Sequence, residues 1–206
     1  MPDNAGLLFV VCGPSGVGKT SLVRALVARC PALTLSVSYT TRPPRPGEQD
    51  GVAYHFVSAG RFAAMQAAGE FLESARVFDH HYGTAAPAVA KTLASGQSVV
   101  LEIDWQGARQ ARETLPGCVT VMVLPPSVAT LRARLGGRGD DEAIIERRMR
   151  DALAELGHWP EFDYLVVNDE FERALDDLVA VTQAATLTRD HQRHWLLANL
   201  PELVAP

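Results

Sequence analysis

A glycine-rich segment near the N-terminus has the residue types and spacing of a phosphate-binding loop. It reads Gly13-Pro14-Ser15-Gly16-Val17-Gly18-Lys19-Thr20, which matches G-x-x-x-x-G-K-[ST] at every fixed position. Glycines allow successive backbone N–H groups to turn toward phosphate oxygens, and the N-terminus of a following helix adds partial positive charge. Lys19 would then reach the β- and γ-phosphates, and the Thr20 hydroxyl would join the shell of a Mg²⁺ ion. The segment predicts a nucleoside triphosphate site, but it does not identify the group that receives a phosphate.

The segments on either side of this loop supply the strand and the helix that the motif requires. Residues 7–12 form an apolar run typical of a buried strand, and residues 21–29 carry apolar side chains at helical spacing. Further apolar strands are expected at residues 98–103, 119–124 and 164–167. Helices are expected at residues 87–94, 107–114, 127–135, 141–156 and 171 to about 188. This alternation predicts an α/β fold, with a P-loop core whose parallel β-sheet is flanked by helices.

Residues 34–84 interrupt this alternation. The run Arg42-Pro43-Pro44-Arg45-Pro46-Gly47 cannot form a helix or a central strand. Around it, strands are expected at residues 35–39, 54–57 and 71–78, with a short helix near residues 58–67. We therefore predict a small β-rich insertion at residues 34–84 in a core made of residues 1–33 and 85–206. Glycines at residues 136, 137 and 139 interrupt two predicted helices and indicate a mobile segment there.

The composition narrows the class of protein. The chain has 206 residues, a net charge of −5 and a pI near 5.7, which argue against a general nucleic-acid binder. Its cysteines, Cys12, Cys30 and Cys118, have no CxxC spacing, so reduced thiols are expected rather than a disulfide framework or a zinc site. No secretory signal and no apolar run of about 18 residues are evident. We expect a cytoplasmic protein without a nucleic-acid or membrane partner.

Four side chains in the insertion are suited to bind a second phosphate. Arg42 and Arg45 stand three residues apart on the proline-stiffened loop, and guanidinium groups bind phosphate oxygens in a bidentate manner. Tyr54 and Tyr82 offer hydroxyl donors to the same oxygens. A solvated basic loop beside two core tyrosines would give the same pattern. The phosphate-binding loop in the same chain favours the functional interpretation.

The chain resembles guanylate kinases over nearly its whole length. The matching segments are residues 13–22, 36–48, 51–57, 69–73, 81–84, 101–108, 138–139, 147–149 and 167–169. Together they are far more specific than the phosphate-binding loop alone. The resemblance implies a P-loop core, a GMP-binding insertion and a lid over about residues 132–150, in agreement with the layout above.

The resemblance also implies a GMP site. Its members are Ser38, Arg42, Arg45, Tyr54, Glu73, Tyr82, Thr84 and Asp104. The arginines and tyrosines would hold the GMP phosphate, and the Ser38 and Thr84 hydroxyls would help hold the base near O6. Guanine presents two donors, N1–H and the N2 amino group, which the Glu73 carboxylate would accept, whereas adenine would face it with an acceptor. Taken alone, Glu73 would be an ordinary exposed glutamate at the end of a strand.

Two carboxylates lie at the end of the strand at residues 98–103. Asp104 is placed by the resemblance near the base, and it could serve the outer shell of Mg²⁺, the guanine or both. Glu102 is a departure, because the family more often has Asp there, so we rank it below Asp104 as an outer-shell group. Asn168 matches the position that borders the ATP adenine, although a turn former in Val-Asn-Asp is a nearly equal interpretation.

The predicted lid supplies positive charge, which phosphoryl transfer needs around the transferred group. Arg134, Arg138 and Arg148 match the arginines that the family brings from its lid, and together with Lys19 they form the predicted catalytic set. Closure would bring them onto the ATP phosphates and exclude water. The stretch between Arg138 and Arg148 is one residue shorter than in familiar members, which leaves the register of Arg138 open. The neighbouring Arg132, Arg147 and Arg150 are expected to be solvated helix charges.

The predicted function is that of a guanylate kinase. The reaction is Mg-dependent transfer of the ATP γ-phosphoryl group to GMP, giving ADP and GDP, for purine nucleotide metabolism and GMP recycling. The expected partners are ATP and GMP, and dGMP is a possible second acceptor. The chain is expected to act as a monomer or a homodimer. The alternatives are a catalytically inactive guanylate-kinase-like protein-binding module and a related kinase with another acceptor, such as a sugar phosphate. The intact phosphate-binding loop and basic lid argue against the first, and the acceptor residues argue against the second.

Overall fold

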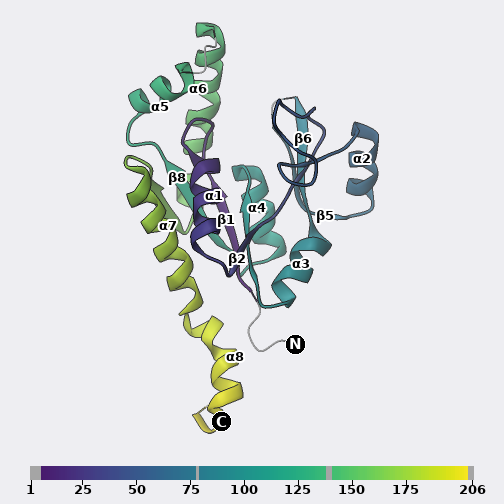
Figure 1. Ribbon diagram of the computed structural model, residues 1–206, viewed down its shortest axis with the longest axis vertical. Coiled ribbons are helices and arrows are strands. Elements are labelled where there is room, and N and C mark those ends of the chain that lie inside the picture. The colour runs from purple at the N-terminus through teal and green to yellow at the C-terminus, as the bar shows by residue number, and fades with distance from the viewer. Residues whose placement is uncertain (1–5, 78, 138–140, 204–206) are drawn as a thin grey trace.

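Five parallel strands form a central sheet in the order β2-β7-β1-β8-β9 (Figure 1). The computed structural model describes residues 6–77, 79–137 and 141–203. The strands are β1 (Leu8–Cys12), β2 (Leu33–Leu35), β7 (Ser98–Glu102), β8 (Val119–Leu124) and β9 (Tyr164–Val167). In β1 every residue is buried, because helices cover both faces of the sheet, and this explains its uninterrupted apolar sequence. The predicted strands at residues 119–124 and 164–167 are confirmed at both ends.

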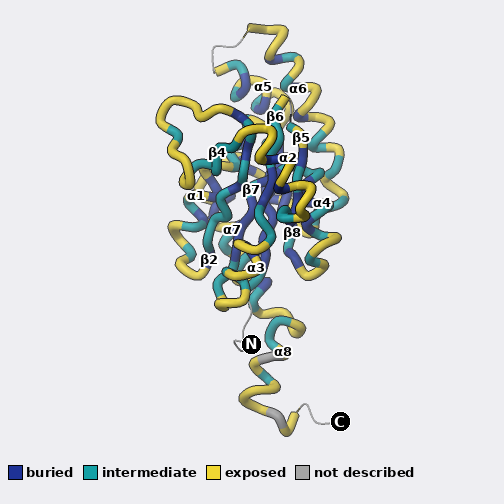
Figure 2. The backbone as a smooth tube through the Cα atoms, turned by 90° about the vertical axis from the view of Figure 1, so that its right-hand side faces the viewer, coloured by how far each residue is buried: buried dark blue, intermediate teal, exposed yellow. Residues whose placement is uncertain are grey.

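Helices pack on the two faces of the central sheet. On one face, α1 (Lys19–Arg29) and α7 (Phe171–Thr186) bury Leu22, Leu26 and Leu178 against β1 and β8. On the other face, α3 (Ala86–Ala94) and α4 (Trp105–Thr114) bury Val89 and Ala108 against β1 and β7. Figure 2 shows the buried strands at the centre of this arrangement. The predicted α/β class, with a parallel sheet flanked by helices, is confirmed.

A second sheet lies beside the core, in the order β4-β3-β6-β5 (Figure 1). Its strands are β3 (Tyr39–Thr40), β4 (His55–Phe56), β5 (Phe71–Val77) and β6 (His80–Ala85). β6 pairs antiparallel with both of its neighbours, whereas β3 and β4 are parallel. Helix α2 (Ala59–Ala67) covers this sheet with the buried side chains of Phe62 and Met65. The expected β-rich segment is therefore present, while its domain limits at residues 34 and 84 stay a prediction.

The strand expected at residues 35–39 is wrong. β2 ends at Leu35 and β3 begins at Tyr39, and the two strands belong to different sheets. The backbone N–H of Ser36 still donates to Val100 O at 3.0 Å in the core, whereas Ser38 O accepts from His55 N at 2.9 Å in the small sheet. Residues 36–38 thus carry the chain from one sheet to the other, a change of partner that alternation along the sequence cannot reveal.

Two helices form the region expected to act as a lid. They are α5 (Val128–Gly136) and α6 (Glu142–Leu156), which lie close to the expected limits. Leu131 and Leu135 of α5 pack against Ile145 and Met149 of α6. Arg138, one of the predicted catalytic residues, lies outside the described residues. A 3-10 turn (Trp159–Glu161) then leads from α6 into β9.

The helix expected from residue 171 to about 188 is in fact followed by a second one. α7 ends at Thr186, and α8 (Arg189–Asn199) starts after Thr188, whose hydroxyl accepts from His191 N at 3.4 Å. A short turn (Pro201–Leu203) follows. α8 extends from the end of α7 away from both sheets, and most of it is exposed (Figures 1 and 2). Among the described residues, no helix is both long and apolar enough to span a membrane.

Candidate active site

A cavity of about 710 Å³ opens between the phosphate-binding loop, the small sheet and α6. The loop contributes most of its residues from Gly13 to Ser21 to the wall. The small sheet and its flanking loops contribute Arg45, Tyr54, Glu73 and Tyr82, and Ser38 comes from the crossing segment at residues 36–38. Glu102 and Asp104 lie on the floor at the carboxyl end of β7. The cavity therefore joins the two groups of residues that the sequence suggested for separate phosphates.

Three glycines of the phosphate-binding loop have a positive φ, and two of them also fit closely against the ends of neighbouring strands. Gly13 has a φ of 144° and Gly18 a φ of 93°, in a region that side chains rarely adopt. A Cβ on Gly13 would lie 2.6 Å from Val123 O, and one on Gly18 would lie 2.4 Å from Asn168 Nδ2. The loop therefore fits closely against the ends of β8 and β9, and this packing fixes the direction of its N–H groups.

Lys19 is the first residue of α1, and its ammonium group is held by main-chain oxygens. Nζ donates to Gly13 O at 2.9 Å and to Ile103 O at 3.2 Å. Burial tends to lower the pKa of Lys19, but Cys12 and then the carboxylates of Glu155, Glu102 and Asp104 outweigh it, and the pKa lies above its ordinary value. Lys19 therefore carries its positive charge at neutral pH.

The two carboxylates after β7 have different partners. Thr20 donates its hydroxyl to Glu102 Oε1 at 2.5 Å. Asp104 caps α4, because its Oδ1 accepts from Gly107 N at 2.9 Å and its Oδ2 from Gln106 Nε2 at 3.1 Å. Glu102, which the sequence analysis ranked below Asp104, thus contacts the Thr20 hydroxyl, the proposed metal ligand. Among the described residues, no cluster of three or more Asp, Glu, His or Cys side chains could hold a metal without help from a ligand.

Asn168 contacts the phosphate-binding loop from the end of β9. Its buried side chain donates from Nδ2 to Val17 O at 2.7 Å. Arg134 donates from both terminal nitrogens to Asn168 O, each at 3.1 Å. In this conformation Arg134 is therefore directed to the end of β9. Whether either residue contacts ATP stays a prediction.

Two arginines of α6 line the cavity. Arg148 lines it as expected, and Arg147, which we expected to be a solvated helix charge, lines it too. Arg132 instead bridges α5 and α6 through ion pairs with Glu142 and Glu146. Consecutive residues on a helix diverge by only about 100°, so a wide cavity can receive both Arg147 and Arg148.

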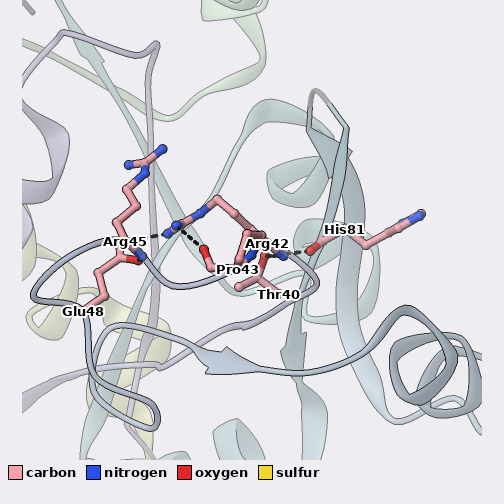
Figure 3. A network of polar contacts seen from close by, with 6 residues as sticks. All are labelled: Thr40, Arg42, Pro43, Arg45, Glu48 and His81. Atoms are coloured by element: carbon pink, nitrogen blue, oxygen red, sulfur yellow. Dashed lines mark hydrogen bonds and ion pairs between the residues drawn. The ribbon is translucent and has the colours of Figure 1, made fainter.

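The basic loop at residues 42–48 is held closed by Glu48 (Figure 3). Arg42 donates from Nη2 to Glu48 Oε1 at 2.8 Å and from Nη1 to Pro43 O at 2.9 Å, and Arg45 N donates to Glu48 Oε2 at 2.7 Å. The hydrogen bond from the Arg42 side chain lowers the pKa of Glu48 most. Burial acts in the opposite direction, and the hydrogen bond from the Arg45 backbone lowers the pKa further. Glu48 was missed from the sequence, although its spacing from both arginines was visible there.

The side chains of this loop lie near two tyrosines. The Arg42 guanidinium carbon lies 5.4 Å from the centre of the Tyr54 ring, and the Tyr54 and Tyr82 rings are 5.8 Å apart. The Arg45 side chain extends away from Glu48 in Figure 3 and lines the cavity. The four candidate phosphate ligands thus lie in one region, and Arg42 forms an ion pair with Glu48.

Glu73 is a buried carboxylate on the cavity wall, with 3% of its surface exposed. Thr84 donates its hydroxyl to Glu73 Oε1 at 2.6 Å, and the Ser38 hydroxyl lies 3.3 Å from that of Thr84. A register shift in β5 between Phe71 and Glu73 sets Glu73 opposite Thr84. Burial raises the pKa of Glu73 to about 7, although the hydrogen bond from Thr84 acts against it. The interpretation of Glu73 as an ordinary exposed glutamate does not hold.

Comparison with known proteins identifies the family. The guanylate kinase family model matches residues 6–185. A guanylate kinase of Alkalilimnicola ehrlichii is 56% identical over 97% of this chain and 98% of its own length, and one of Nitrosococcus oceani is 55% identical over 97% and 99%. The crystal structure of guanylate kinase from Anaplasma phagocytophilum has a TM-score of 0.81 and 29% identity, and the match covers 96% of this chain and 97% of that one. The chain belongs to the guanylate kinase family.

Proposed function

We propose that this protein transfers the γ-phosphoryl group of ATP to GMP, giving ADP and GDP. The observation that carries the proposal is a buried carboxylate, Glu73, in the same cavity as the Lys19 phosphate-binding loop. Lys19 and its loop suit the phosphates of a triphosphate, and Glu73 suits a base that presents two donors. The relatives named guanylate kinase, which match almost end to end, support the same reaction.

Base selection follows from the partners of Glu73. Because Thr84 holds one oxygen of the carboxylate, the side chain is fixed before a base arrives. Guanine N1–H and its N2 amino group would donate to this carboxylate, and the Ser38 hydroxyl would remain near O6. Adenine would place its N1 acceptor against the carboxylate, leaving buried polar groups unpaired. A loss of this kind weakens a mismatched substrate by roughly 10⁴-fold.

The GMP phosphate would be held by Arg45, Tyr54, Tyr82 and Arg42. Arg45 already lines the cavity, whereas Arg42 is oriented by its ion pair with Glu48. An arginine oriented by a carboxylate loses less side-chain freedom on binding a phosphate. The phosphate would therefore meet a prepared set of donors beside the ATP site.

Thr20 and Glu102 fit a magnesium ion bound together with ATP. Mg²⁺ commonly takes one or two protein oxygens, substrate phosphates and several waters, and it does not require a cage of carboxylates. The Thr20 hydroxyl would be a direct ligand, with Glu102 or Asp104 holding coordinated water. When bound, the ion neutralises charge on the ATP phosphates.

The transferred group would be stabilised by cations rather than by covalent catalysis. Lys19 lies at one side of the cavity, and Arg147 and Arg148 lie at another. Arg134 and Arg138 would join them when the helices of the lid close. This arrangement suits a single in-line transfer, in which the GMP phosphate attacks the γ-phosphorus and ADP leaves with the bridging oxygen.

The experiment that tests the function is an acceptor panel. ADP release from ATP and Mg²⁺ is followed with GMP, dGMP, AMP, CMP and UMP, each at the same concentration. We expect turnover with GMP and none above background with AMP, CMP or UMP; the dGMP rate reports whether the ribose 2′-hydroxyl is read. Folded protein that binds GMP without turnover would instead establish the inactive binding module, and a preference for AMP would refute the role of Glu73.

A further inference from the structure

Gln110, on α4, contacts the main chain of β5 at two points. Its Nε2 donates to Ser74 O at 2.9 Å, and its Oε1 accepts from Ser74 N at 3.0 Å. Ser74 immediately follows Glu73, the buried carboxylate of the proposed GMP site. Gln110 itself is not one of the residues that line the main cavity. It therefore contacts the strand that carries Glu73 without being placed to touch a substrate.

The strand β5 is irregular at this point. It stands at the edge of the small sheet, with β6 as its neighbour. The register between these two strands shifts between Phe71 and Glu73, which interrupts the ladder just before Ser74. Backbone N–H and C=O groups outside a ladder require other partners. The amide of Gln110 supplies one donor and one acceptor to Ser74, as a further strand would.

Two more residues of α4 lie against β5. A Cβ on Gly107 would lie 2.6 Å from Glu73 Oε2, so the carboxylate rests directly on the helix at this glycine. Thr114 Oγ1 lies 3.4 Å from Leu72 O. Residues 107, 110 and 114 are three and four apart, which is the spacing of one helical face. The position of Glu73 thus depends on how closely β5 is held to this face of α4.

We propose that Gln110 is a positioning residue for base selection, which holds the main chain of β5 against α4 so that Glu73 faces guanine with both carboxylate oxygens in place. The inference rests on the proposed function, in which Glu73 binds the base. Loss of the amide leaves the Ser74 N–H and C=O to water and lets this part of β5 move away from Gly107. Guanine then meets a displaced carboxylate that cannot accept from both of its donors.

Gln110→Leu tests the inference, because it keeps much of the side-chain volume and removes both hydrogen bonds. GMP affinity is measured by calorimetry without ATP, and steady-state kinetics are measured with each substrate varied in turn. We expect GMP affinity to fall by about tenfold, the effect of weakening a hydrogen bond to a charged group. The KM for ATP should stay within about twofold of wild type, because the phosphate-binding loop is untouched.

Gln66→Leu is the matched control. Gln66, on α2, is also a glutamine that contacts Ser74, but its Nε2 donates to the Ser74 hydroxyl, at 3.2 Å, and not to the main chain. Its replacement should leave GMP affinity and both KM values as in wild type. A loss of GMP affinity in Gln66→Leu equal to that in Gln110→Leu would overturn the inference, because the main-chain contact would then have no special effect.

Inosine monophosphate separates a displaced Glu73 from a general fault. This nucleotide has the N1–H donor of guanine but lacks the 2-amino group. Wild-type protein should therefore bind GMP more tightly than inosine monophosphate by about tenfold. Gln110→Leu should reduce that preference to about threefold or less, since the displaced carboxylate accepts from one donor only. A fault elsewhere lowers both affinities equally, and an unchanged preference would overturn the inference.

A double variant shows whether Gln110 acts through Glu73. The ratio kcat/KM for GMP is measured for Glu73→Gln with and without Gln110→Leu. We expect the second substitution to lower this ratio by less than about twofold in the Glu73→Gln background, because residues of one network are not additive. An equal loss in both backgrounds would overturn the inference.

Two outcomes separate this inference from other failures. Should Gln110→Leu not fold, Gln110→Asn takes its place: its amide is one methylene too short to reach both Ser74 atoms, so it must lose GMP affinity severalfold, and wild-type affinity overturns the inference. Wild-type protein that binds GMP without turning it over would refute the proposed function alone. Normal turnover together with wild-type GMP affinity in folded Gln110→Leu would refute the role of Gln110 alone.

Discussion

Thr84 donates its hydroxyl to Glu73 Oε1 across 2.6 Å, between paired positions of β5 and β6. This hydrogen bond holds the carboxylate in a buried site, where burial raises the pKa of Glu73 to about 7. Ionisation of Glu73 therefore costs free energy in the folded protein, because the carboxylate has few water contacts and no arginine partner among its described hydrogen bonds. A guanine base with two donors would relieve that cost, whereas an adenine would not.

This cost predicts that Glu73→Gln stabilises the protein while impairing its function. The folded pKa of Glu73 lies above its ordinary value of 4.5, so the folded state binds a proton more tightly than the unfolded state. The carboxyl thus lowers stability as pH rises from about 4.5 to 7, by up to about 3 kcal/mol above pH 7. We expect the variant to raise the free energy of unfolding by roughly 1–3 kcal/mol at pH 8, and by much less at pH 4, in urea titrations. A variant less stable than wild type at pH 8 would contradict this account.

The same titration predicts a pH dependence of GMP affinity. Only the ionised Glu73 carboxylate can accept both guanine donors, so wild-type affinity should fall as the pH drops through about 7. Below that pH the loss approaches about tenfold per unit. Calorimetric titration with GMP from pH 5.5 to 8.5 measures it. Glu73→Gln supplies the control, because titration of the GMP phosphate remains in both proteins while the contribution of Glu73 disappears.

Removing the Thr84 hydroxyl should move that titration upward. The hydrogen bond from Thr84 lowers the pKa of Glu73, and Thr84→Val keeps the side-chain shape without the donor. We expect the midpoint of the GMP affinity profile to rise by about one pH unit, and GMP affinity at pH 7 to fall severalfold. Thr92→Val, which removes an exposed hydroxyl that donates to Ala88 O on α3, is the matched control. An unchanged midpoint would show that Thr84 does not set the charge of Glu73.

The sequence predicted the central sheet well and the contacts of the site only in part. β8 coincides with its predicted range because a strand buried on both faces leaves a mostly apolar run. β9 also coincides with its predicted range, although it is an edge strand in which only Val166 is buried. The passage at residues 36–38 was missed because alternation is the same whichever sheet a strand joins. The contact of Glu155 with the Cys12 thiol was missed because it joins two distant parts of the chain, with no local spacing to reveal it. The Asp104 cap was also hidden, since a motif position does not show which hydrogen bonds a side chain makes.

Glu48 provides a prediction about the acceptor loop. It binds Arg42 through one oxygen and the Arg45 backbone through the other, and so closes the loop. Glu48→Ala should release both arginines from a prepared geometry and raise the KM for GMP by about tenfold, with little change in ATP affinity. Steady-state kinetics with each substrate varied in turn measure the two effects. Equal changes for ATP and GMP would indicate a general loss of structure instead, and circular dichroism of the variant checks that point.

The contact between Thr20 and Glu102 leads to a prediction about magnesium. Glu102 accepts the Thr20 hydroxyl, whereas both oxygens of Asp104 are engaged at the start of α4, so Glu102 is better placed to orient the metal-binding hydroxyl and coordinated water. Glu102→Gln keeps the size of the side chain but removes its charge, and it should raise the Mg²⁺ concentration needed for half-maximal turnover by about tenfold. Glu102→Asp retains the charge at the shorter length that the family more often shows, and should have a smaller effect. Initial rates at fixed ATP and GMP with Mg²⁺ varied provide the measurement. If Glu102→Gln shows the wild-type dependence on Mg²⁺, the carboxylate serves only the structure of the loop, and the metal must rely on Thr20, the phosphates and water.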